Sequence, residues 1–134
     1  MRLHLAVFAL ALGLSGVAQA QDLQPLDLAD VDPDLVGDMF GTWEIRDLEG
    51  GKSCKVVLKR DEVIGGMQID VDPACPKVFP VMGDIAAWRL MDGWAIDLVD
   101  AERKLRIRFT TPDLEYVASP ETDGIFTIVP LPKG

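Results

Sequence analysis

Histidine, serine and the acidic residues are the side chains in this sequence with the potential for catalysis. The only histidine, His4, lies in the first twenty residues, and the only serines beyond them are Ser53 and Ser119. The rest of the chain therefore cannot form a Ser-His-Asp or Cys-His centre or the usual histidine-containing zinc site. Among 22 acidic residues chance carboxylate pairs are expected, and a catalytic pair must also lie in a cleft with separated pKa values. The sequence therefore does not indicate an enzyme, and no cofactor is expected.

One acidic run, DVDPD at residues 30–34, is spaced like the opening of an EF-hand calcium loop. That loop needs glycine at its sixth position and glutamate at its twelfth, where this sequence has Leu35 and Gly41. We interpret the run as a solvated acidic segment and expect no metal site of the chain's own.

The first twenty residues have the three-part layout of a secretory signal peptide. Arg2 gives a basic start, residues 5–14 are apolar, and residues 18–20 form a small-residue A-x-A site, which predicts cleavage before Gln21. A membrane-spanning helix needs roughly 20 apolar residues, so this run is too short for stable membrane insertion. The 114 residues that remain carry 12 basic and 22 acidic side chains, a net charge of −10. Such a surface disfavours nucleic acid and anionic membranes as partners.

Cys54 and Cys75 are the two cysteines of the chain. An exported protein with an even number of cysteines most often pairs them, and a reactive thiol pair would favour close spacing such as C-x-x-C. We therefore predict a structural disulfide. It would close a loop of about 21 residues and stabilise the fold by roughly 3 kcal/mol.

The segment that follows the predicted cleavage site is expected to be an arm, at residues 21–38. Residues 21–40 hold six aspartates and no basic residue, with no strand-like alternation. Near its end, Asp32 offers a capping side chain before Pro33, which predicts a short helix that Gly37 and Gly41 limit. The eleven residues before Asp32 would reach roughly 36 Å if extended.

Residues 39–134 are predicted to form one β domain, because short alternating runs there are separated by turn residues. The alternation favours eight strands and an all-β, eight-stranded antiparallel up-and-down barrel of lipocalin-like shape. Asp92-Gly93 is interpreted as a type I′ hairpin turn, and the proline-rich residues 73–84 as a long loop or helical turn. The predicted strands are residues 42–46, 53–59, 67–71, 86–90, 94–99, 105–110, 114–118 and 125–129.

Several of these features occur together in one known family. Gly41-Thr42-Trp43, the cysteine pair, Ala87-Trp88-Arg89 and Asp92-Gly93-Trp94 follow one another in an order that resembles the Inh family of bacterial metalloprotease inhibitors. These inhibitors block secreted zinc proteases of the serralysin class. The resemblance covers residues from about Met39 to the C-terminus.

The resemblance implies a compact barrel with one disulfide and an N-terminal arm that lies in the catalytic cleft of the protease. In such inhibitors the free α-amino group ligates the zinc ion and displaces the catalytic water. By position, the protease-binding residues would be Gln21, Asp22, Leu23, Gln24 and Pro25. The chain would then be a periplasmic or secreted inhibitor of a serralysin-type zinc metalloprotease, a monomer when free.

Two other interpretations stay open. The first is a lipocalin-like small-molecule binding module, with Trp43, Trp88 and Trp94 around an internal cavity, although large inward-facing aromatic residues more often simply fill a barrel. The second is an envelope interaction protein that uses the acidic arm as a tether.

Overall fold

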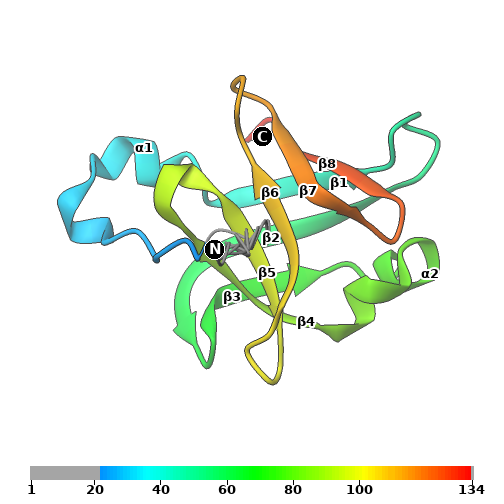
Figure 1. The fold of residues 1–134 in the computed structure, drawn as a ribbon, viewed down its shortest axis with the longest axis horizontal. Helices are drawn as coiled ribbons and strands as arrows, with labels where there is room; N and C mark the ends of the chain where they lie inside the picture. Colours follow the sequence, from blue (N-terminus) through cyan, green and yellow to red (C-terminus); the bar gives the residue numbers. More distant parts are fainter. Residues whose placement is uncertain (1–21, 134) are drawn as a thin grey trace, which may run out of the picture.

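The structure, a computed structural model, describes residues 22–133. It shows a closed barrel of eight antiparallel strands joined in sequence order (Figure 1). The predicted fold class is therefore confirmed. The predicted signal peptide and Gln21 lie outside the described residues. Within residues 22–133, no helix combines the length and the apolar character that crossing a membrane requires.

The elements follow the predicted order, and most ends shift by one or two residues, but the strands predicted to end at residues 59 and 118 each continue for four more residues. The strands are β1 (Gly41–Arg46), β2 (Ser53–Val63), β3 (Gly66–Val71), β4 (Ile85–Leu90), β5 (Ile96–Asp100), β6 (Leu105–Thr110), β7 (Tyr116–Thr122) and β8 (Ile125–Pro130). The helical segments are the 3-10 helix η1 (Leu28–Asp30), α1 (Pro33–Gly37), α2 (Cys75–Val78), and the 3-10 segments η2 (Pro80–Asp84) and η3 (Asp92–Trp94). The short helix of the arm and the helical turn in the proline-rich segment are thus both present.

The barrel interior is filled by the inward-facing residues of the alternating strands. On β1, Trp43 and Ile45 are 3% and 0% exposed. Trp88 on β4 and Phe109 on β6 are fully buried. The barrel closes where β1 pairs with β8, with Ile45 opposite Ile128. Successive side chains of a strand therefore point alternately into the core and toward the surface.

Two predicted strand starts are wrong, and in both cases a residue has a left-handed backbone conformation. The strand predicted at residues 114–118 begins at Tyr116, because Leu114 has φ 70°. The strand predicted at residues 94–99 begins at Ile96, because Trp94 has φ 64°. Extended strands need negative φ, so both residues belong to the preceding loops. A third departure is Leu105, which starts its strand as predicted but is 44% exposed.

Gly66 allows β3 and β4 to approach closely at the start of β3. Its φ is 159°, and a Cβ atom there would collide with the carbonyl oxygen of Trp88. Only glycine fits this contact without a shift of the backbone.

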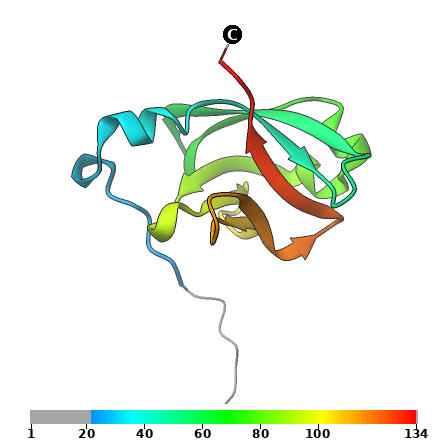
Figure 2. The same cartoon turned by 90° about the horizontal axis from the view of Figure 1, so that it is seen from above.

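The up-and-down topology gives the barrel two distinct ends (Figure 2). We call the first the arm end: it holds the arm, α1, and the turns β4–β5 (residues 91–95) and β6–β7 (residues 111–115). The β2–β3 turn (residues 64–65) folds along the outer face of β4 and β5, where a Cβ at Gly65 would lie 3.6 Å from Arg103 Cγ and 3.8 Å from the side chains of Ala87 and Val99. We call the second the disulfide end: it holds α2, η2, and the turns β1–β2 (residues 47–52), β5–β6 (residues 101–104) and β7–β8 (residues 123–124). All of the predicted protease-binding residues that the structure describes are at the arm end.

Candidate functional site

Residues 24–26 of the arm pair with the end of β4 and the turn that follows it. The Leu26 amide donates to the Leu90 carbonyl at 3.0 Å, and the Asp92 amide donates to the Gln24 carbonyl at 2.8 Å. The Gln24 amide donates to Asp92 Oδ2 at 3.2 Å, and Pro25 forms a β-bridge with Met91. We call these contacts the clamp. They dock the arm on the barrel, so it is not the extended eleven-residue stretch that the sequence suggests.

The two described residues before the clamp lie on the side of β5 and β6. Leu23 is half-buried, and it lines a hollow of about 320 Å³ with Asp92, Gly93 and residues 110–112. Asp22 is exposed, and its charge contributes to raising the pKa of Arg108. Of the five predicted binding residues, the structure therefore places Asp22, Leu23, Gln24 and Pro25 together at the arm end. Gln21 lies outside the described residues.

On the other side of the clamp, the arm borders a larger groove. Leu26 and Leu28 pack against the core, and the Ala29 amide donates to Asp27 Oδ1 at 3.0 Å to cap η1. The groove, of about 530 Å³, lies between residues 25–29 and the strands β2, β3 and β4. It is lined by Trp88 but by neither Trp43 nor Trp94. The three tryptophans therefore do not share this hollow, as the small-molecule interpretation would require.

The helix α1 connects the arm to the barrel through buried contacts. The Asp34 amide donates to Asp32 Oδ1 at 2.9 Å, which is the predicted cap, and Pro33 starts the helix. After it, Met39 is 6% exposed, and its carbonyl accepts a 2.9 Å hydrogen bond from Trp43 Nε1. The segment that follows α1 is thus hydrogen-bonded to Trp43, a core aromatic residue of β1.

The β4–β5 turn that receives the arm differs from the predicted type I′ hairpin. A type I′ turn needs positive φ at Asp92 and Gly93. The positive values fall one residue later, at Gly93 (70°) and Trp94 (64°), and the Met91 amide donates to the Ala95 carbonyl at 2.8 Å. The turn thus has three central residues. Its Trp94 carbonyl accepts a 2.7 Å hydrogen bond from Tyr116 Oη, which compensates for the unusual conformation.

A buried ion pair on the barrel wall beside the arm was missed by the sequence analysis. Asp97 is 2% exposed, and its carboxylate accepts from Arg108 Nε at 2.7 Å and Nη2 at 2.8 Å. These hydrogen bonds and the charge of Asp97 raise the pKa of Arg108, against the opposing effect of burial. The alternation of polar and apolar residues predicts that both side chains face outward. It does not indicate that an outward-facing side chain such as Asp97 is buried.

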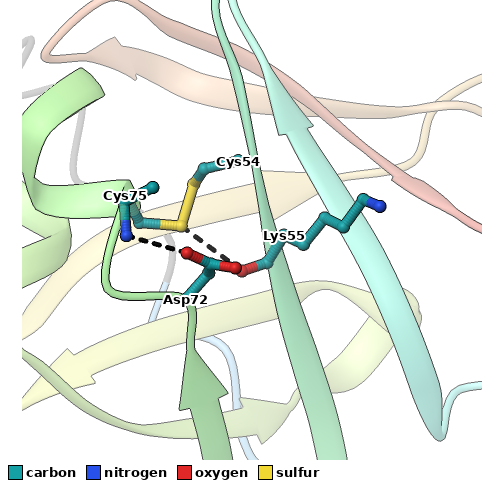
Figure 3. The surroundings of a disulfide bond; sticks show 5 residues. Cys54, Lys55, Asp72 and Cys75 are labelled. Carbon is teal, nitrogen blue, oxygen red and sulfur yellow. Dashed lines mark hydrogen bonds between the residues drawn. A yellow bond between two sulfur atoms is a disulfide. The ribbon is translucent and has the colours of Figure 1, made fainter.

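The disulfide end holds the one predicted covalent link. Cys54 on β2 and Cys75 at the start of α2 form a disulfide with their Cα atoms 5.1 Å apart (Figure 3). The Cys75 amide donates to the Asp72 carbonyl at 2.8 Å, and the Asp72 amide donates to the Lys55 carbonyl at 3.1 Å. The predicted disulfide is confirmed. Residues 22–133 contain no group of three or more metal-ligating side chains placed to hold a metal ion.

A comparison with protein-family models matches this chain to an inhibitor family. The model described as "Protease inhibitor Inh" matches residues 34–127, from α1 to β8, which is well over half of the chain. Residues 24–26 of the clamp lie before the matched range, and their partners Leu90, Met91 and Asp92 lie inside it. A search of curated proteins finds no match.

Proposed function

The chain belongs to the Inh family of protease inhibitors, and we propose that it inhibits a secreted zinc metalloprotease of the serralysin class through the start of its arm. The zinc-protease target follows from the resemblance described above. The clamp is the observation that supports an N-terminal inhibitory element. It holds residues 24–26 against the barrel by three hydrogen bonds that the backbone amides of Gln24, Leu26 and Asp92 donate.

The clamp supports a short inhibitory element. If the signal peptide is cleaved before Gln21, only residues 21–23 precede the clamp. Three extended residues span roughly 10 Å, compared with roughly 36 Å for a free eleven-residue arm. A short extension on a rigid body loses less conformational entropy on binding than a loose arm does, since ordering costs about 1–2 kcal/mol for each residue. The docked arm is therefore suited to deliver a chain terminus into a cleft.

The proposed inhibitory group is the α-amino group that cleavage creates. Its ordinary pKa of about 7.7–8.0 lets it lose a proton readily to a competing metal ion. Bound to the zinc of the protease, it would displace the water that the metal activates for hydrolysis. Because the proton competes with zinc, inhibition should weaken as the pH falls from about 8 to about 6.

The proposed periplasmic location rests on the predicted signal peptide. A signal peptide cleaved during export would place the protein in the periplasm, where an inhibitor protects the producing cell from its own protease before secretion. Mass spectrometry of the mature chain tests this step. An N-terminus at residue 21 supports it, and retention of residues 1–20 contradicts it.

Two N-termini, one with a free amine and one without, give the direct test of the mechanism. An N-terminal glutamine can cyclise to pyroglutamate: its α-amino nitrogen bonds to the side-chain carbonyl carbon and the side-chain amide leaves as ammonia, which removes the free amine and leaves residues 22–25 unchanged. We expect a Gln21→Ser chain, which cannot cyclise, to inhibit a purified serralysin-type zinc protease. The pyroglutamate form of the parent chain should be weaker by about two orders of magnitude, equivalent to roughly 3 kcal/mol for one lost zinc ligand.

Two outcomes would contradict the proposal. Equal potency of the two forms would remove the amine mechanism. No inhibition by the Gln21→Ser chain at micromolar concentration, together with inhibition of a serine protease by the same chain, would assign the inhibitor to another protease class.

A further inference from the structure

Strand β5 is buried on both of its faces. Its inward residues Ile96 and Leu98 are 0% exposed, as expected for a barrel core. The outward residues are buried as well: Ala95, which precedes the strand, Asp97 and Val99 are 2%, 2% and 0% exposed. Outward side chains of a small barrel normally face water. The outer face of β5 is therefore covered by other parts of the molecule.

Two segments lie against this outer face, one toward each end of the strand. A Cβ atom at Gly65 of the β2–β3 turn would lie 3.8 Å from the Val99 side chain. Toward the other end, Leu23 of the arm lines the hollow of about 320 Å³ together with Ala95 and residues 110–112. The arm therefore does not end at the clamp but continues along the outside of β5 and β6.

A row of charged side chains crosses the outer face between these two segments. Asp97 is the cross-strand partner of Arg89 on β4 and of Arg108 on β6. Arg108 donates to both carboxylate oxygens of Asp97, at 2.7 and 2.8 Å. Arg89 Nε donates to the Gly65 carbonyl instead. One carboxylate thus lies between two guanidinium groups, so the row has a net positive charge. We call Asp97 and Arg108 the wall pair.

The start of the arm brings an acidic side chain to this row. Leu23 lines the same hollow as Thr110, and Arg108 is the outward residue of β6 that precedes Thr110. The residue before Leu23 is Asp22, which is exposed. The hydrogen bonds to Asp97 raise the pKa of Arg108 most, and the charges of Asp97 and Asp22 raise it further, against the opposing effect of burial. Asp22 therefore lies close enough to Arg108 for the two charges to attract each other.

The two partners of this attraction differ in how firmly they are held. The Arg108 side chain is 13% exposed and is fixed by its two hydrogen bonds to Asp97. Asp22 is exposed and belongs to the three residues that precede the clamp. An attraction that acts partly through water has no strict geometry. It favours one direction of the chain start without holding the terminus against the barrel.

We propose that the wall pair is a positioning element for inhibition: Arg108, held in place by Asp97, attracts Asp22 and so directs the N-terminus toward the protease cleft. The proposal rests on the proposed function, because only an inhibitory terminus needs a fixed direction. Neither member of the pair contacts the zinc ion. Both act through the arm.

A wall without charge tests the proposal. Asp97→Asn/Arg108→Gln makes both members neutral and leaves no buried charge without a partner, so the variant should fold, which urea denaturation checks. Against a purified serralysin-type zinc protease, Asp22→Asn should raise the inhibition constant roughly threefold at low salt, as expected for one exposed charge pair. Asp22→Asn should have no effect in the neutral wall. Arg108→Lys keeps the charge, so the effect of Asp22→Asn should persist there.

Two controls isolate the attraction. Asp30→Asn removes an exposed arm carboxylate on the other side of the clamp, and it should inhibit like the parent. About 1 M salt shortens the range of exposed charges to roughly 3 Å, so the difference between Asp22→Asn and the parent should disappear.

Nuclear magnetic resonance relaxation of the free chain gives a readout that does not need the protease. The Leu23 amide of the parent should be ordered like the barrel, with an order parameter of about 0.85. Asp22→Asn and the neutral wall should lower this value by similar amounts. A merely structural role of the wall pair would not make the order of Leu23 depend on the charge of Asp22.

The outcomes separate this proposal from the proposed function. Equal effects of Asp22→Asn in the parent and in the neutral wall would mean that Asp22 acts on the protease directly, which overturns the positioning role. Stronger inhibition by Asp22→Asn would make the attraction a latch that opposes insertion, which also overturns it. Inhibition and Leu23 order that are unchanged in every variant overturn this proposal alone. No inhibition by the parent overturns the proposed function as well.

Discussion

At the disulfide end, a covalent bond ties the α2 segment to β2, whereas the described part of the arm is held by hydrogen bonds and by the packing of Leu26 and Leu28 against the core. Cys75 is fully buried and Cys54 nearly so, and the disulfide joins chain segments 21 residues apart. At the arm end, hydrogen bonds join the chain segments: those of the clamp, the Trp43–Met39 bond and the Tyr116–Trp94 bond.

The two ends are therefore expected to contribute different properties. A cross-link stabilises the fold whether or not a partner is present, because it acts largely by constraining the unfolded chain. The hydrogen bonds of the clamp hold a short segment in place but add little to the free energy of unfolding, because water competes for exposed hydrogen-bonding groups. The disulfide end is therefore expected to determine stability, and the arm end to determine inhibition.

The largest expected effect on stability comes from removing the disulfide. Replacing both Cys54 and Cys75 by alanine should lower the free energy of unfolding by roughly 3 kcal/mol, for a loop of this length. Urea denaturation measures this loss. Inhibition, assayed at a temperature where the variant is folded, should match the parent. A folded variant that fails to inhibit would show that the ends are coupled.

A smaller effect is expected from Tyr116, which links β7 to the turn that holds the arm. In Tyr116→Phe the Trp94 carbonyl loses its 2.7 Å donor, so unfolding should become easier by roughly 1–2 kcal/mol. If the turn also positions the arm, inhibition should weaken as well. Inhibition equal to the parent would show that the turn keeps its shape without this bond.

The same residue gives a pH test. Burial raises the pKa of Tyr116 from 10.0 to about 12. The folded chain therefore keeps a proton that the unfolded chain loses, so the contribution of Tyr116 to stability is present below pH 10 and is lost between about pH 10 and 12. Tyr116 is the only tyrosine, so phenolate absorbance reports it alone. A midpoint near 10 in the folded protein would contradict the buried environment.

The clamp offers a test confined to the arm. Asp92→Ala removes the acceptor of the Gln24 amide, a contact that is 3.2 Å long and exposed. We expect inhibition to weaken about fivefold, equivalent to roughly 1 kcal/mol, with little change in melting temperature. Asp92→Asn is the matched control, because it keeps an acceptor oxygen and should inhibit like the parent. Equal loss in both variants would point to the charge of Asp92 instead.

How far the sequence predicts the two ends differs for a physical reason. The disulfide was predicted from the even number of cysteines together with the expected export, and the strands were predictable because side-chain burial repeats every second residue. The clamp was not predictable, because it uses backbone groups of Gln24 and Leu26, which every residue except proline carries. Nor did the aspartates of the arm signal that it docks. Their composition resembles that of a solvated tail.

The turns show the same limit. Asp92-Gly93 correctly marked a turn, but tertiary contacts place the positive φ at Gly93 and Trp94, where Tyr116 holds the Trp94 carbonyl. Leu114 has a left-handed conformation, but leucine is not a residue type that favours it, so the sequence gives no sign of it.

The smallest expected effect concerns an acidic turn at the disulfide end. Asp100 Oδ1 accepts hydrogen bonds from the amides of Lys104 and Glu102, both at 2.9 Å, and Arg106 lies 3.6 Å from Oδ2. The Lys104 amide, then the Glu102 amide and the charge of Arg106, lower the pKa of Asp100, against the opposing effect of burial. The unfolded chain therefore takes up a proton here at a higher pH than the folded chain does. The stabilising contribution of Asp100 is present above about pH 4 and is lost as the pH falls further.

Asp100→Asn isolates this charge, because the amide oxygen can still accept from both backbone groups. We expect the urea midpoint of the variant to be below that of the parent at pH 7 and the difference to be smaller at pH 3, since the stabilisation that this charge gives the parent declines below about pH 4. Inhibition at pH 8 should be unchanged, because Asp100 is at the disulfide end. A midpoint difference of the same size at both pH values would assign the loss to the hydrogen bonds. Weaker inhibition at pH 8 would instead show that the turn acts through the barrel on the arm.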